Sequence, residues 1–165
     1  MRTSVLLRKL HKWGAVLSAL PLLVIVASGI LLQLKKDVAW IQPPTQAGAG
    51  SELSISFSRI LEAARSVPEA GITGWDDVDR LDVRPDKGMV KVRGKNRQEV
   101  QVDTAAGEVL QVAYRRSDLI ENIHDGSFLN GSAKLCLFLP TGVILLGLWA
   151  TGLYLFFLPY LRRSR

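Results

Sequence analysis

Two long uncharged runs constrain the fold of this chain more than any other feature of its sequence. No charged side chain occurs between Trp13 and Leu34, and none occurs between Leu135 and Leu161. A helix of about 20 apolar residues crosses the hydrocarbon core of a bilayer. We therefore predict two transmembrane helices, at residues 13–34 and 135–158. The first run is longer than the roughly 7–15 apolar residues of a signal peptide and lacks a small-residue cleavage site, so we expect it to be retained.

The distribution of charge predicts the topology of these helices. The chain has 21 basic and 15 acidic residues, a net charge of +6. All 15 acidic residues lie between the two runs, together with 14 basic ones, whereas every charged side chain in the tails at residues 1–12 and 159–165 is basic. Positively charged flanks of membrane helices stay in the cytoplasm. We expect a two-pass protein of the cell inner (cytoplasmic) membrane, with both termini cytoplasmic and the centre periplasmic. This topology accounts for the basic excess, so we predict no nucleic-acid partner.

The exported segment begins as a linker and then becomes patterned. Residues 35–55 contain paired Pro, Gly and Ser residues, which are typical of a linker. In residues 56–67 the apolar side chains recur with the period of a helix, and Ser56 is placed to cap the first turn. The apolar residues of this amphipathic helix are Phe57, Ile60, Leu61, Ala64 and Val67.

The apolar period then changes from helical to alternating. Four short segments alternate, and turn signals separate them at residues 85–88, 94–96 and 103–107. One helix followed by four such strands predicts an antiparallel β-meander with the helix packed across it. The expected fold class is an α+β membrane protein: two transmembrane helices flank a small domain at 56–116, and a connector at 117–134 leads to the second helix. The alternating apolar residues are Leu81 and Val83, Val90 and Val92, Val100 and Val102, and Leu110 and Val112.

This small domain contains no pattern that indicates catalysis. It has no histidine, no cysteine and no glycine-rich loop for phosphate. Its densest acidic run, at residues 76–79, lacks the regular ligand spacing of a calcium loop, and we interpret these residues as solvated charges. We therefore do not expect an enzyme, and we assign no metal ligand.

Several segments resemble one known family. "ISFSRILEAARSVPEAGI" and the hairpin "VQVDTAAGEVL" resemble a PepSY domain, and "RKLHKWGAVLSALPLLVIVASGILL" and "IHDGSFLNGSAKLCLFLPTGVILLGLWATGLYLF" resemble the helices of PepSY-associated transmembrane proteins. The resemblance covers about residues 8–157 and implies a periplasmic binding domain, in some members one that restrains peptidases. Larger members with four or more helices include haem-containing reductases of siderophore-bound iron, and histidines in positions like His11 and His124 are candidate haem ligands there.

The two histidines are the candidate ligands of haem b, the one cofactor that the resemblance suggests. With the predicted topology, His11 and His124 lie at opposite faces of the membrane, about 35 Å apart along a helix, so one haem cannot join them. Each would need a second ligand from another chain, in a homodimer or with a membrane protein partner. In the alternative, His11 is an interfacial residue between Lys9 and Lys12, and His124 caps or precedes a helix.

Small residues four positions apart predict where the helices pack. Gly14 and Ser18 form such a pair in the first helix, and Gly147 and Thr151 form one in the second. These pairs fit contact between the two helices of one chain as well as dimerisation.

The sequence leaves three functions open. The first is a noncatalytic accessory or regulatory subunit of a membrane assembly, whose exported domain binds a partner protein. The second is a haem-b electron-transfer subunit related to ferric-siderophore reductases. The third is a periplasmic module that restrains a peptidase. The lipid bilayer is the expected environment in all three.

Overall fold

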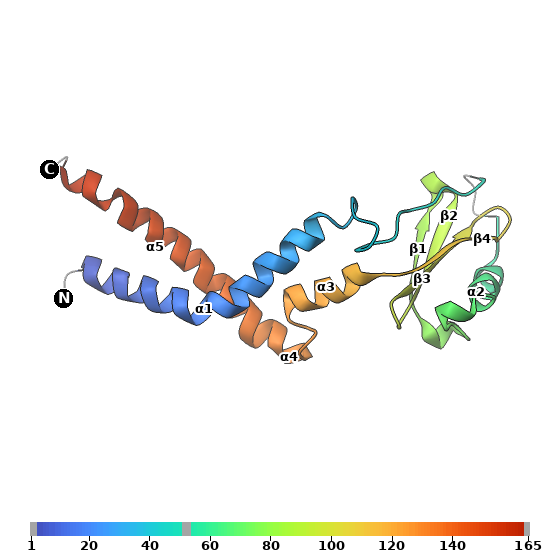
Figure 1. The fold of residues 1–165 in the computed structure, drawn as a ribbon, viewed down its shortest axis with the longest axis horizontal. Coiled ribbons are helices and arrows are strands. Elements are labelled where there is room, and N and C mark those ends of the chain that lie inside the picture. The colour runs from blue at the N-terminus through green and yellow to red at the C-terminus, as the bar shows by residue number, and fades with distance from the viewer. Residues whose placement is uncertain (1–2, 51–53, 164–165) are drawn as a thin grey trace. The chain divides into compact units, whose positions relative to one another are not determined.

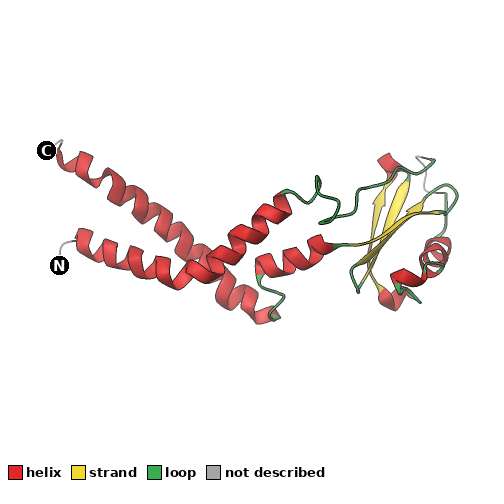
Figure 2. Ribbon diagram, viewed as in Figure 1, coloured by secondary structure: helices red, strands yellow, loops and turns green. Residues whose placement is uncertain are grey.

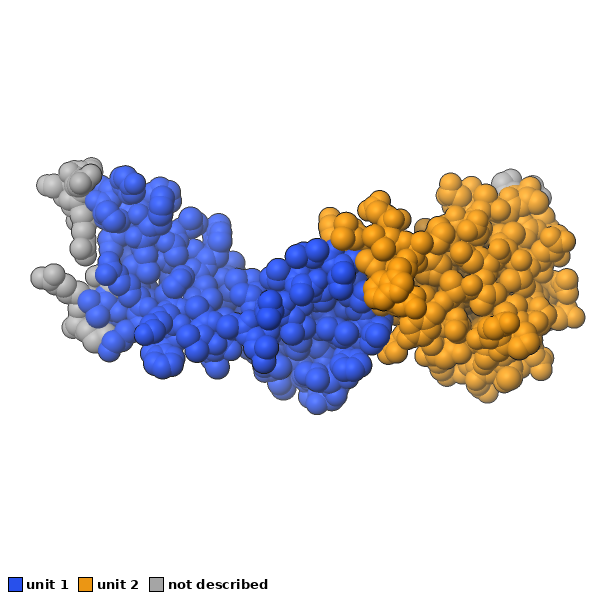
Figure 3. Space-filling model, in the orientation of Figure 1, with its two compact units in different colours: residues 1–32, 119–165 blue, residues 33–118 orange. Residues whose placement is uncertain are grey.

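The computed structural model describes residues 3–50 and 54–163. Residues 1–2 and 164–165 of the predicted tails, and residues 51–53 of the predicted linker, lie outside the described residues. The chain forms two compact units (Figure 3). Residues 1–32 and 119–165 make up the helical unit, and residues 33–118 make up the sheet domain.

The helical unit contains the two predicted membrane spans (Figure 1). Its first span covers Val5–Gln33 and its second covers Gly131–Tyr160, which are 29 and 30 residues long. Apolar side chains of both helices are largely exposed: Leu17 by 73% and Leu146 by 66%. Such apolar surface is stable only against lipid, so the chain is a two-pass membrane protein. The helices of this unit are α1 (Thr3–Gln33), the end of α3 (Arg116–Asp125), α4 (Gly131–Ala133), a π-helical stretch (Lys134–Phe138) and α5 (Leu139–Arg163).

A π-helical stretch lies near the start of the second span, immediately before Leu139 and Pro140. The N–H of Leu139 donates to Lys134 O, five residues back. Pro140 has no backbone N–H and cannot donate to the carbonyl four residues before it. Next to this stretch, Gly126 has a φ of +81°, and a Cβ there would collide with the ring of Phe138. Only glycine fits this turn between α3 and the second span.

The sheet domain has the predicted helix and meander (Figure 2). All neighbouring strands pair antiparallel in the order β1-β2-β3-β4. The N–H of Arg59 donates to Ser56 Oγ at 3.2 Å, so Ser56 caps the helix as predicted. The predicted α+β fold is confirmed. Its elements are α2 (Phe57–Arg65), β1 (Val78–Arg84), β2 (Met89–Gly94), β3 (Gln98–Asp103) and β4 (Val109–Tyr114).

The core of the sheet domain lies between α2 and one face of the sheet. Ile60 and Ala64 of α2 are buried against valines of the two central strands: Val90, Val92, Val100 and Val102. Three of the predicted apolar positions lie outside the core. Phe57, at the start of α2, is 64% exposed, and Val83, on the edge strand β1, is 38% exposed. The register of β3 and β4 shifts between Gln101 and Val102, so that Val109 pairs with Val102 and packs against the core in place of Leu110. The alternation does not reveal such a bulge in advance.

The opposite face of the central strands is polar and equally buried. Lys91, Glu99 and Gln101 are at most 2% exposed. The segment before α2 covers them, because Gln46 N donates to Gln101 Oε1 at 2.8 Å and Gln101 Nε2 donates to Pro44 O at 2.9 Å. Residues 42–50 therefore lie along the sheet although they have no regular secondary structure.

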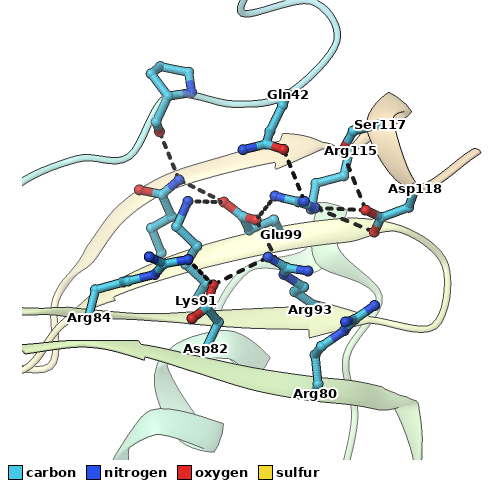
Figure 4. A network of polar contacts seen from close by, with 12 residues as sticks. Gln42, Arg80, Asp82, Arg84, Lys91, Arg93, Glu99, Arg115, Ser117 and Asp118 are labelled. Carbon is cyan, nitrogen blue, oxygen red and sulfur yellow. Dashed lines mark hydrogen bonds and ion pairs between the residues drawn. The ribbon is translucent and has the colours of Figure 1, made fainter. Parts of the chain in front are cut away.

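Glu99 is at the centre of this buried face (Figure 4). Its carboxylate accepts from Arg115 Nη1 at 2.6 Å and from Gln101 Nε2 at 2.7 Å, and it lies 3.3 Å from Lys91 Nζ. Arg115 also donates to Asp118 at 3.2 Å. Buried charges are tolerated only when they are paired and hydrogen-bonded in this way.

Replacement of Glu99 should destabilise the sheet domain strongly. In Glu99→Gln the buried cations Lys91 and Arg115 lose their shared counterion, and we expect the free energy of unfolding to fall by about 3–5 kcal/mol. Pulse proteolysis of the full chain in detergent and urea measures this change. Glu62→Gln is the control, because Glu62 pairs with Arg59 at the surface, where such a pair contributes about 0–1 kcal/mol. Equal effects of the two changes would contradict a structural role for Glu99.

Candidate functional site

His11 is held against the second span by its Nδ1 atom. This atom lies 2.9 Å from Thr151 Oγ1 on α5. The hydroxyl of Thr151 has a single proton, which is donated to Gly147 O at 2.7 Å. With its proton in that bond, the hydroxyl oxygen can only accept from His11, which favours the proton on Nδ1 of the imidazole.

His124 lies within α3 and is held against the first span in the same way. Its Nδ1 lies 3.0 Å from Ser28 Oγ and 3.1 Å from Ile25 O. A carbonyl oxygen can only accept, so Nδ1 of His124 is the donor. Ser28 donates its own proton to Val24 O. In the neutral imidazole of both histidines, the lone pair is consequently on Nε2.

Each imidazole contacts a tripeptide of the pattern Ala-Ser/Thr-Gly in a membrane span. His124 contacts Ala27-Ser28-Gly29 and His11 contacts Ala150-Thr151-Gly152 through the hydroxyl and the glycine. A Cβ at Gly29 would lie 3.4 Å from His124 Cε1, and one at Gly152 would lie 3.5 Å from His11 Cε1. The rings thus pack directly on the helix backbone. Sequence reasoning included Thr151 and its neighbour Gly152 only as small packing residues and missed Ser28 and Gly29, although the repeated Ala-Ser/Thr-Gly pattern is visible in the sequence.

Three of the four predicted packing residues lie with His11 where α1 contacts α5 of the same chain. Gly14, Gly147 and Thr151 line a hollow of about 230 Å³ together with Leu10, His11, Ile144 and Leu148. A Cβ at Gly14 would lie 3.2 Å from Leu148 Cδ2, so the small residue permits the close approach. Ser18 is buried one turn further along α1 and donates to Gly14 O at 2.8 Å.

The structure does not bring the two histidines together. His11 and Ser28, the contact of His124, are 17 residues apart on α1, which corresponds to about 26 Å along the helix. The helical unit therefore contains two separate histidine sites.

Asp125, the residue after His124, stabilises the turn that follows α3. The carboxylate of Asp125 accepts from Lys134 Nζ at 2.8 Å and from the hydroxyl of Ser127 at 2.6 Å. These hydrogen bonds, that of Lys134 first, lower the pKa of the Asp125 carboxyl to about 2. Asp125 stays ionised at physiological pH and links the end of α3 to the start of the second span.

The donor chemistry of each site fits one axial ligand of a haem. Metal-binding histidines commonly donate one ring N–H to a protein acceptor, which orients the other nitrogen towards the metal. His11 and His124 have this arrangement, and Nε2 of neither has a hydrogen bond among the described residues. Within the part of the chain that the structure describes, no three His, Cys, Asp or Glu residues cluster as a metal site. The hollow beside His11 is also smaller than the roughly 300–1,000 Å³ of ordinary ligand pockets.

Comparison with known proteins identifies the family. The model of the family described as the PepSY-associated TM region matches residues 8–164. The chain belongs to this family. No curated protein and no solved structure matches it. The resemblance of both flanks to PepSY-associated transmembrane proteins is thereby confirmed.

The tautomer of each histidine can be tested separately in this PepSY-associated protein. Thr151→Val removes the acceptor of His11, and we expect His11 to lose its preference for the proton on Nδ1. Ser28→Ala leaves Ile25 O as an acceptor, so His124 should keep its proton on Nδ1. Long-range ¹H–¹⁵N spectra of ¹⁵N-histidine-labelled protein distinguish the tautomers.

Thr141→Val is the matched control for this experiment. Thr141 is a buried threonine of α5 that donates to Leu137 O, and its replacement should leave both imidazole spectra unchanged. An unaltered His11 spectrum in Thr151→Val would contradict the assignment of the proton.

Proposed function

We propose that this chain is a noncatalytic accessory subunit of a larger assembly in the inner membrane, with cytoplasmic termini and a periplasmic sheet domain. The observation that carries the proposal is the state of the two histidines. Each imidazole is anchored through Nδ1 to its own chain, while its Nε2 has no hydrogen bond among the described residues. An imidazole held in this way is suited to bind a group contributed from outside the two-helix unit.

The sheet domain offers a surface for a partner protein. Phe57 and Trp75 form an edge-to-face pair with ring centroids 6.4 Å apart, and they are 64% and 44% exposed. They line a shallow pocket of about 440 Å³ with Val78, Arg80 and Leu81. Exposed aromatic side chains beside an arginine are typical of the energetically dominant part of a protein interface.

Site-specific photocrosslinking in native membranes tests the partner. A photoreactive amino acid at position 75 should give one defined crosslinked species, and Phe57→Ser should reduce its yield at least about fivefold, because a buried aromatic contact in an interface contributes 1 kcal/mol or more. The same photoreactive residue at position 95, in the exposed turn between β2 and β3, is the control. Equal crosslinking from positions 75 and 95 would argue against this surface.

A second candidate function is electron transfer by haem b, and the tautomers of the histidines favour it. His11 and His124 would each contribute one axial imidazole, and another chain would contribute the opposite ligand. Haem b would supply one-electron transfer, with a potential influenced by the axial imidazole and its hydrogen bond. We do not propose restraint of a peptidase, which rests on the family resemblance alone.

An absorbance spectrum of the protein purified from haem-supplied cells tests the second candidate. We expect a Soret band with sharp α and β bands after reduction by dithionite. Because the sites are separate, His11→Ala and His124→Ala should each remove about half of the bound haem, and the double variant should remove all of it. A featureless wild-type spectrum, together with a crosslinked partner that survives both substitutions, would leave the accessory role without haem.

A further inference from the structure

A basic pocket lies on the polar side of the sheet domain. It has a volume of about 350 Å³, and residues 42–45 form part of its wall. No Asp or Glu occurs among its lining residues, whereas five are basic: Lys35, Lys36, Arg84, Lys91 and Arg93. All five belong to the same compact unit.

The carboxylates behind this pocket do not balance its positive charge. Asp82 pairs with Arg84 at 2.9 Å and with Arg93 at 3.3 Å (Figure 4). Glu99 pairs with Lys91 at 3.3 Å, but Arg115 binds the same carboxylate at 2.6 Å. Arg115 also binds Asp118 at 3.2 Å. Arg84, Lys91, Arg93 and Arg115 thus share three carboxylates, and Lys36 adds a further positive charge to the pocket wall.

Arg93 has a buried hydrogen-bond donor without a partner. Its Nε–H has no hydrogen bond among the described residues, although Nε lies 3.8 Å from Glu99 Oε2. Burial, followed by the positive charge of Arg115, lowers the pKa of the Arg93 guanidinium below its usual value. A buried donor without a partner lowers the stability of the fold, and repulsion from a nearby cation lowers it further. An anion in the pocket would reduce this electrostatic repulsion.

We propose that this pocket binds a phosphoryl anion. Several Lys and Arg side chains around a compact hollow match the charge and the multiple acceptor oxygens of a phosphate group. The pocket is formed by side chains of two strands and of the segment that follows α1, so the ligand would also tie this segment to the sheet. This inference is independent of the histidine sites.

The position of Lys35 and Lys36 along the chain indicates the nearest source of a phosphoryl group. Lys35 and Lys36 follow Gln33, the last residue of the first membrane span, by two and three positions. A chain extends at most about 3.6 Å per residue, so their Cα atoms lie within about 11 Å of the end of the span. The lipid headgroup region begins there. An anionic lipid headgroup is therefore one source of the phosphoryl group, and free phosphate is the other.

Thermal unfolding of the full chain in an uncharged detergent tests the pocket. The probes are dihexanoyl phosphatidylglycerol and inorganic phosphate, and dihexanoyl phosphatidylcholine is the zwitterionic comparison. We expect a saturable rise of Tm with phosphatidylglycerol that is much smaller with phosphatidylcholine. Lys36→Gln and Arg84→Gln should each raise the apparent Kd at least about tenfold, because each loses a charged hydrogen-bond donor.

These substitutions avoid the buried part of the ion network. Lys36 is exposed and the Arg84 side chain is 51% exposed, whereas the Lys91 and Arg93 side chains are 3% and 15% exposed and belong to the ion network of the polar face. Lys95→Gln is the matched control, since it removes the same charge from an exposed turn of the same domain. Its Kd should equal that of the wild type.

The two probes distinguish the sources of the ligand. An effect of phosphatidylglycerol alone would assign the site to a lipid headgroup. An equal effect of inorganic phosphate that is lost in Lys36→Gln and Arg84→Gln would assign it to free phosphate. The absence of a saturable shift with either probe would overturn the proposal, as would equal weakening by Lys95→Gln and Lys36→Gln.

Discussion

The exclusion of water from the hydrocarbon core of a bilayer is the constraint on which the helical unit depends. Polar groups at membrane depth must find partners within the protein. The hydroxyls of Ser18, Ser28 and Thr151 satisfy this requirement by donating to carbonyls of their own helices. Those of Ser28 and Thr151 then have only acceptor capacity left for the histidines. The same requirement that satisfies the small polar residues of the spans therefore favours the proton on Nδ1 of each imidazole.

The sheet domain is subject to a different requirement. It is small, and it buries charged side chains that need partners. One face of its central strands forms a valine core with α2, and the other face buries Glu99 with two cations. Residues 42–50 cover the polar face through hydrogen bonds to Gln101 and Asp103. Part of this cover, residues 42–45, also forms a wall of the basic pocket.

Much of the fold follows from periodicity, and its failures have local causes. The length of the uncharged runs and the change from helical to alternating period were sufficient for the two spans, α2 and the four strands. Leu110 was misplaced because a bulge between β3 and β4 shifts the alternation by one residue. The candidate histidines were chosen by resemblance and by their rarity, but their contacts Ser28 and Gly29 are about 95 residues from His124 in sequence, and no local pattern joins such distant positions.

The sequence by itself determined that the chain crosses a membrane twice and carries a small antiparallel domain, because hydrophobic length and period are local properties of a chain. Only the tertiary structure decided how the polar residues are used. It placed Thr151 against His11 and Ser28 against His124, which favours one tautomer of each imidazole. It also gathered basic residues from the segment after α1, from β1 and from β2 around one pocket. Hydrogen bonds and charge pairs are short-ranged and directional, so their partners are settled by packing between distant segments rather than by composition.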